Sequence, residues 1–186
     1  ADTLRNELNT NLGLSIEQLR YINVYDLFGF SDELLERSRY TVFGEVVTDA
    51  VTDECDMQGM PFLAVEFLPG QFDQRAASAV DCVHLIEPNA EVKIKSSRLY
   101  IFDKSVSAED MARIEKYLIN AVESRKKNLE VLSDAESAEV KPVAVLEGFR
   151  NMKEEELAPY CKANGLAMNA DDLREVVNYF NKEGRD

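Results

Sequence analysis

The stretch Phe67-Leu-Pro-Gly-Gln-Phe-Asp-Gln-Arg75 decides how the middle of the chain folds, because it joins a predicted strand to a predicted helix. Residues 62–68 (Phe-Leu-Ala-Val-Glu-Phe-Leu) alternate and are rich in β-forming types, which predicts a half-buried strand. Pro69 and Gly70 end this strand, since proline has no N–H to donate and glycine accepts turn dihedrals. From about Asp73 the apolar spacing becomes helical, and the predicted face contains Ala76, Ala79, Val80, Val83 and Ile86.

The corner between this strand and this helix is the candidate contact site. It brings together the free N–H groups of a helix start and several polar side chains. The candidate contact residues are Pro69, Gly70, Gln71, Phe72, Asp73, Gln74 and Arg75. The alternative is an ordinary connector, in which Asp73 caps the helix and Arg75 forms a surface ion pair worth less than about 1 kcal/mol.

The composition is that of a globular protein and restricts the class of partner. Of 186 residues, 45% are apolar and 30% charged, and the net charge of −14 argues against nucleic acid or an anionic membrane as the main partner. There is neither an apolar run long enough to span a bilayer nor a secretory signal, and three widely spaced cysteines predict no disulfide framework. We therefore expect a cytoplasmic protein. The chain begins within a helical pattern and without methionine, so we expect a trimmed or internal fragment.

Periodicity and caps predict an alternation of helices and strands in the first part of the chain. We expect helices at 2–12, at 31–42 with Ser31 as N-cap, and from Ser107 to beyond Val122. The other expected strands are residues 19–26, a weaker one at 46–52, and one within 91–103 whose clearest part is Arg98-Leu-Tyr-Ile-Phe102.

Two helix starts repeat at a fixed offset. Ser31-x-Glu33-x-x-x-Arg37 returns 76 residues later as Ser107-x-Glu109-x-x-x-Arg113, and each follows a predicted strand. We therefore predict a duplicated α+β unit. The strand at 62–68 would then have its counterpart before Ala1, so the first unit is expected to lack its first strand.

The remaining residues predict a linker and a small helical domain. Residues 133–142 have few large apolar groups and are typical of a linker, which separates a domain at 1–132 from one at 143–186. In the second domain, 143–148 is expected to be extended, Asn151 to cap one helix and Asn169 to cap the last.

Catalytic motifs are missing from the sequence. It contains no phosphate-binding loop or dinucleotide fingerprint, and His84 is the sole histidine. Cys82 and His84, two positions apart on one helix, point in different directions and form no nucleophile–base pair. We expect this fragment to catalyse nothing and to hold no cofactor or metal.

Several segments together resemble phosphoribosylformylglycinamidine synthase (FGAM synthase) in its large, single-chain form. The likeness runs from about Leu12 to Asp186 and includes Leu68-Pro-Gly-Gln-Phe-Asp-Gln-Arg-Ala76, Tyr117-Leu-Ile-Asn120, Val122-Glu-Ser-Arg125, Tyr40-Thr-Val-Phe43, Leu146-Glu-Gly-Phe149 and Gly165-Leu-Ala-Met168. The resemblance implies an N-terminal domain like a fused dimer of the small PurS-type subunit, with an antiparallel sheet, packed helices and a following helical linker domain.

The resemblance also implies a function for the parent enzyme. That enzyme uses ATP, magnesium and glutamine to convert formylglycinamide ribonucleotide to its amidine, with ammonia supplied by a glutaminase domain. The part present here would bridge the synthase and glutaminase domains, which are its implied partners, and help to form the ammonia route. The alternative is a free-standing regulatory module of ferredoxin-like build that binds a small metabolite between its halves.

Overall fold

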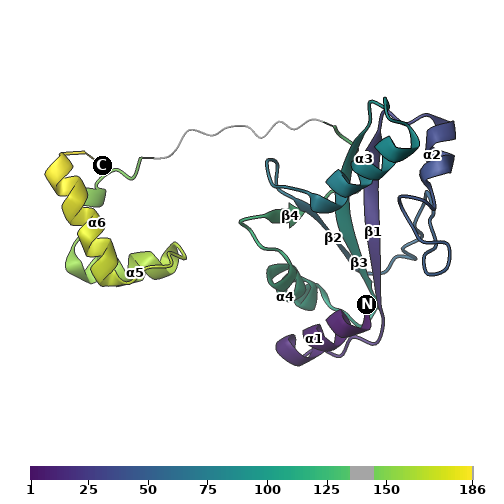
Figure 1. Cartoon of the computed structure of the whole chain (residues 1–186). Coiled ribbons are helices and arrows are strands. Elements are labelled where there is room, and N and C mark those ends of the chain that lie inside the picture. Colours follow the sequence, from purple (N-terminus) through teal and green to yellow (C-terminus); the bar gives the residue numbers. More distant parts are fainter. Residues whose placement is uncertain (135–144, 186) are drawn as a thin grey trace. The chain divides into compact units, whose positions relative to one another are not determined.

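The computed structural model describes residues 1–134 and 145–185, which fall into two compact units, Ala1–Ala138 and Glu139–Asp186 (Figure 1). Within these residues the chain has six α-helices and one four-stranded antiparallel sheet, so the predicted α+β class is confirmed at that level. Most of the predicted linker, residues 133–142, lies outside the described residues. Residues 145–148, which we expected to be extended, form coil and a turn.

The sheet of the first unit has the order β1-β3-β2-β4. Its two longest strands are β1 (Leu19–Phe28), at one edge, and β3 (Lys93–Phe102), which pair from Leu19 opposite Phe102 to Phe28 opposite Lys93. The strand before the corner, β2 (Phe62–Phe67), pairs with the other side of β3, and the short β4 (Ser124–Lys126) pairs with β2.

The strand expected at 46–52 is wrong. These residues form turns and coil, and two of the three valines of the segment, Val46 and Val47, are exposed. The carboxylate of Asp49 accepts the N–H of Glu45 at 3.0 Å, so a local side-chain bond holds the backbone in a turn.

Four helices belong to the first unit: α1 (Asp2–Leu12), α2 (Asp32–Ser38), α3 (Gln74–Ile86) and α4 (Ala108–Leu118). The predicted caps are confirmed, because the Ser31 and Ser107 hydroxyls accept the N–H groups of Leu34 and Asp110.

Both of these capped helices end earlier than expected. The α2 helix stops at Ser38 and is followed by turns rather than reaching residue 42. The α4 helix stops at Leu118 because the next residue is extended, and the turn from Asn120 to Ser124 leads the chain into β4.

The main core lies on one face of the sheet, the face that the helices cover (Figure 1). Where α1 and α4 pack on the sheet, the core contains Leu8, Leu63, Phe102 and Ile114, all of them fully buried. Where α3 and α2 pack on the sheet, the core contains Leu34, Ala76, Ala79, Val83 and Ile94. Side chains alternate along a strand, so Ile94, Ser96, Arg98, Tyr100 and Phe102 all belong to this helix-covered face.

The opposite face of the sheet carries a smaller cluster and a buried charge. Ala64, Leu99 and Ile101 are buried there, with Met57, Met60 and Leu129 packed against them. Near this cluster the Lys127 ammonium, whose side chain is only 6% exposed, contacts the carboxylates of Asp26 and Glu66.

Asp103, which directly follows β3, forms hydrogen bonds with the residues that precede β1. Its Oδ2 accepts the N–H groups of Glu17 and Gln18 at 2.8 and 2.9 Å, and its Oδ1 accepts both the N–H and the hydroxyl of Ser105. Partial desolvation of the carboxylate opposes ionisation, but these four hydrogen bonds outweigh it and lower the pKa of Asp103 to about 2.

The order helix, strand, helix occurs twice, as α1-β1-α2 and as α3-β3-α4, with β1 and β3 as antiparallel neighbours. The offset of 76 residues between Ser31 and Ser107 applies to the helix caps and not to the strands. In the observed register, odd-numbered residues of β1 share a face with even-numbered residues of β3. If the residues of β1 and β3 corresponded at an even offset such as 76, a residue on one face of β1 would correspond to a residue on the opposite face of β3.

The second unit is helical. It contains a short 3₁₀ turn, Phe149–Asn151, followed by α5 (Glu154–Ala163) and α6 (Ala170–Glu183). Its core is formed by Leu157, Cys161, Leu173 and Val177.

Of the two caps expected in this unit, one is confirmed and one is wrong. Asn169 caps α6 in a reciprocal capping box with Asp172. Asn151 does not cap α5, because it ends the 3₁₀ turn and the N-cap is Lys153, whose N–H donates to the Glu156 carboxylate at 2.7 Å.

Candidate functional site

The corner predicted as a contact site is attached to its surroundings at both ends. After β2, the residues Pro69 and Gly70 form a turn in which Gly70 has a φ of 87°, a conformation that glycine adopts without strain. The N–H of Leu68 donates to the Glu123 carbonyl at 2.9 Å, and the Gln71 side-chain amide donates to the Val122 carbonyl at 3.3 Å. The turn is thereby joined to the segment that enters β4.

Asp73 joins the other end of the corner to the centre of the sheet. Its Oδ1 accepts the N–H of Ala76 at 2.9 Å, which is the predicted helix cap, and also accepts the Ser96 hydroxyl at 2.8 Å. Its Oδ2 accepts the N–H of Ser96 at 2.7 Å. One carboxylate thus fixes the start of α3 to the middle of β3, so the corner is held on two sides.

Arg75 does not form the surface ion pair that the ordinary-connector alternative includes. Within the described residues it contacts no carboxylate, and its guanidinium donates to the Tyr25 hydroxyl at 3.1 Å. That hydrogen bond raises the pKa of Arg75 above its usual value. The guanidinium of Arg75 is therefore held against β1 by Tyr25 and forms no surface ion pair within the described residues.

Beside the corner, the helix-covered face of the sheet is hollowed between α3 and the end of α4. The hollow has a volume of about 650 Å³, and side chains from both helices and from the strands beneath them form its wall. Phe72, Gln74 and Arg75 line it, whereas Asp73 turns inward to Ser96. Pro69, Gly70 and Gln71 are exposed residues of the corner that do not line it.

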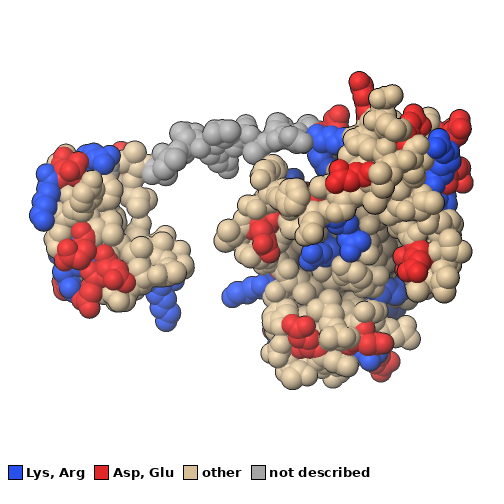
Figure 2. Space-filling view, viewed as in Figure 1, with Lys and Arg blue, Asp and Glu red and all other residues tan. Residues whose placement is uncertain are grey.

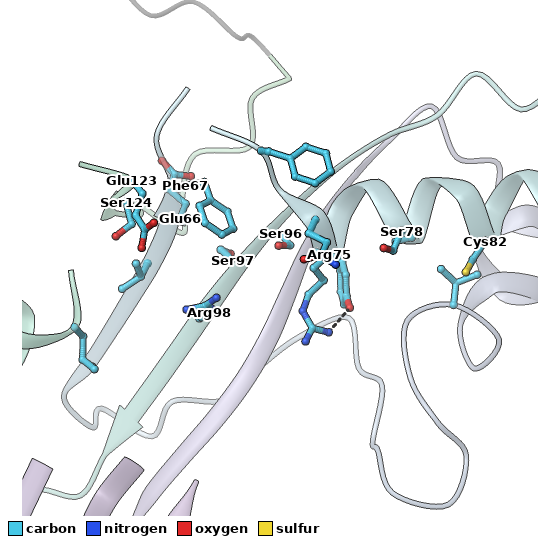
Figure 3. A pocket seen from close by; sticks show the side chains of 17 residues that line it. Glu66, Phe67, Arg75, Ser78, Cys82, Ser96, Ser97, Arg98, Glu123 and Ser124 are labelled. Atoms are coloured by element: carbon cyan, nitrogen blue, oxygen red, sulfur yellow. Dashed lines mark hydrogen bonds between the residues drawn. The ribbon is translucent and has the colours of Figure 1, made fainter. Parts of the chain in front are cut away.

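Arg98 rises from the floor of this hollow (Figure 3). It is the one exposed residue of β3, every other residue of which is buried or half-buried. Its guanidinium carbon lies 5.9 Å from the centre of the Phe67 ring, and Tyr100 lies next but one on the same face. Burial is the main cause that raises the pKa of Tyr100.

Four residues beside the hollow were not predicted as site residues: Arg98, Tyr25, Ser96 and Phe67. A signal for Arg98 was present, because a charged side chain in an otherwise buried strand needs either a partner or access to solvent. The other three residues join the site only because the antiparallel pairing of β1, β3 and β2 places them beside it.

The groups that commonly carry catalysis do not converge in the part of the chain that the structure describes. No cluster of three or more histidine, cysteine or acidic residues there could hold a metal ion. His84 is exposed, with its Nε2 3.1 Å from the Ala90 carbonyl oxygen, and Cys161 is buried. Cys82 is exposed at the edge of the hollow. The arrangement supplies hydrogen-bond donors, positive charge and aromatic surface, which are suited to binding.

Among the described helices, none has the length and apolar character that crossing a membrane requires. Comparison with known proteins adds no assignment, since no family model and no curated protein matches this chain.

Proposed function

We propose that this chain is the N-terminal, non-catalytic portion of a large FGAM synthase, with a PurS-dimer-like domain followed by a helical linker domain. Its partners are the synthase and glutaminase domains of that enzyme, and its location is cytoplasmic. The proposal rests on the sequence resemblance. The repeated order α1-β1-α2 and α3-β3-α4 around two antiparallel neighbours supports it.

The observation that carries the bridging role is the exposed aromatic ring of Phe72 on a corner that is fixed at both ends. The side chain of Phe72 is 75% exposed, and hydrogen bonds from Gln71 and to Asp73 hold the residues on either side of it. Exposing a large apolar ring is unfavourable unless another surface covers it. A rigid loop also loses little conformational entropy on docking, so it suits a permanent contact between domains.

The chemistry of the parent reaction explains why a bridge is needed. ATP and magnesium in the synthase domain would activate the amide oxygen of formylglycinamide ribonucleotide, and ammonia from the glutaminase would then attack. Free ammonia is soon protonated in water and then has no lone pair for attack. The two sites must therefore stay joined and shielded, and a non-catalytic domain that holds them together contributes to the rate without touching the substrate.

The test uses the full-length enzyme with two nitrogen sources. Replacing Gln71, Phe72 and Arg75 by alanine should lower glutamine-supported synthesis about tenfold, because nitrogen delivery depends on the contact. Synthesis supported by added ammonium salt should change by less than about twofold. The matched control is Leu85→Ala, which removes an apolar side chain of similar exposure, 86%, from the far end of α3. Unchanged glutamine kinetics, or an equal loss with both nitrogen sources, would refute the bridging role.

The second candidate function is a free-standing ferredoxin-like module that binds a small metabolite. The hollow beside the corner favours it, although the N–H of Ala76 at the start of α3 is occupied by Asp73 and is closed to a ligand. A thermal-shift screen of this chain against nucleotides and amino acids separates the two functions. Strong stabilisation of this chain by itself favours the module, whereas a bridge needs no ligand of its own.

A further inference from the structure

We propose that the hollow between α3 and the middle of β3 binds a small phosphate ester, with Arg75 and Arg98 as the ligands of its phosphate group. The site shares Phe72 and Arg75 with the proposed interdomain contact, but Arg98 and Ser78 belong to the site alone, so their variants test it separately from the bridging role. Its ligand class follows from the charges, hydroxyl groups and aromatic surfaces that line the hollow.

Arg98 provides the first positive charge. Within the described part of the chain it forms no ion pair, although the protein has 35 acidic residues against 21 basic ones. Its place is the centre of a strand whose other residues are shielded, where a guanidinium is retained only if water or an anion solvates it. The ring of Phe67 lies against one side of the guanidinium, and one of the guanidinium donors is shared with the Tyr100 hydroxyl.

Arg75 provides the second positive charge from the first turn of α3. Its hydrogen bond to Tyr25 restrains the side chain, and within the described residues the nearby Asp73 carboxylate acts on its charge without forming an ion pair with it. Figure 3 shows Arg75 and Arg98 on the same hollow, with Ser78 beside them, whereas the Ser96 hydroxyl donates to Asp73. In Figure 2, lysine or arginine atoms lie in the middle of this face, and acidic atoms lie mainly towards its edge. Two guanidinium groups with hydroxyl donors nearby are the usual ligands of phosphate.

The acidic residues that line the hollow leave room for an anion. The Glu66 carboxylate is paired with Arg125 at 2.7 Å and lies 3.5 Å from the Lys127 ammonium. Glu123 belongs to the exposed segment before β4, at the end of the hollow away from α3. An anion is thus favoured between Arg75 and Arg98 and disfavoured at the β4 end.

The rest of the ligand is expected to be flat and partly apolar. The volume of about 650 Å³ lies within the usual range for small-molecule sites, and it exceeds what a bare phosphate ion would fill. Phe67 and Phe72 supply aromatic surface on which a planar group could stack. A nucleoside monophosphate satisfies both requirements, so AMP is the probe.

The experiment titrates the whole chain with AMP and with adenosine, followed by amide NMR shifts. AMP should bind with a dissociation constant of about 1 mM or tighter, with shifts at Arg98 and the first turn of α3, and adenosine should bind at least tenfold more weakly. Inorganic phosphate should compete with AMP. Arg98→Gln and Arg75→Gln should each weaken AMP binding at least tenfold. The matched control Arg37→Gln, on α2 and outside the hollow, should leave it unchanged.

Ser78→Asp is a second kind of variant, which keeps the proposal testable if an arginine variant fails to fold. Ser78 is exposed on α3 and lines the hollow, so the added carboxylate should abolish AMP binding while the NMR spectrum remains that of a folded protein. The proposal is overturned by any of three results: no AMP binding up to about 10 mM, equal binding of adenosine, or full binding in folded Arg98→Gln or Ser78→Asp protein.

Discussion

Replacing Asp73 by alanine tests whether one carboxylate holds the corner to the sheet. The change removes an N-cap, which costs about 1 kcal/mol. It also leaves the N–H and the hydroxyl of buried Ser96 without their acceptor, and an unsatisfied buried donor costs about 1–3 kcal/mol. We expect Asp73→Ala to lower the free energy of unfolding of the first unit by about 2–4 kcal/mol.

The assay must follow the first unit by itself, because the chain has two compact units and no tryptophan. Urea unfolding monitored by the amide NMR signals of β3 meets that need. The matched control is Asp81→Ala, which removes an exposed aspartate from the same helix and should change the unfolding free energy by less than about 0.5 kcal/mol.

A double-mutant cycle with Ser96→Ala sharpens the test. Asp73 and Ser96 share two hydrogen bonds, so their substitutions should be non-additive by about 0.5–1.5 kcal/mol. The reasoning fails if Asp73→Ala matches the Asp81→Ala control, or if the two substitutions add within about 0.3 kcal/mol.

Two further predictions concern the charges of the first unit. Because the pKa of Asp103 is lowered to about 2, its contribution of about 1–2 kcal/mol should be present above about pH 4 and be lost as the pH falls towards 2. Acid unfolding curves of Asp103→Asn should lack this component, and parallel curves for both proteins would contradict it. Lys127→Met leaves the shielded Asp26 carboxylate unpaired, whereas Glu66 keeps Arg125, and should cost about 3–5 kcal/mol in urea unfolding, part of which Asp26→Asn should restore. If Lys127→Met lowered the free energy of unfolding by less than about 1 kcal/mol, the ion pair between Lys127 and Asp26 would not be desolvated.

The local elements of this chain were readable from short stretches of sequence. Ser31, Ser107, Asp73 and Asn169 all cap helices as predicted, because a cap bonds to an N–H only three residues away. The wrong predictions also have local causes. Val46 and Val47 suit a strand, but no neighbouring strand pairs with them in the described structure, and Asp49 holds a turn instead.

Of the predicted corner, the sequence indicated the strand, the turn, the cap and the first residues of α3. It did not indicate that Asp73 also binds Ser96 or that Arg75 turns to Tyr25, because these partners lie 23 and 50 residues away in the chain. Arg98 enters the site for the same reason, since only the pairing of β3 with β1 and β2 places its side chain on the hollowed face.

The sequence alone therefore determined most of the helices and strands and the caps that start the helices, since these depend on spacings of two to four residues. It wrongly predicted a strand at 46–52 and did not predict β4. Tertiary structure alone decided the strand order β1-β3-β2-β4, the hollow with its two arginines and the buried contacts of Lys127. Those features join residues far apart in the chain. Their partners are selected by which faces can be buried together, and local propensity carries no information about that choice.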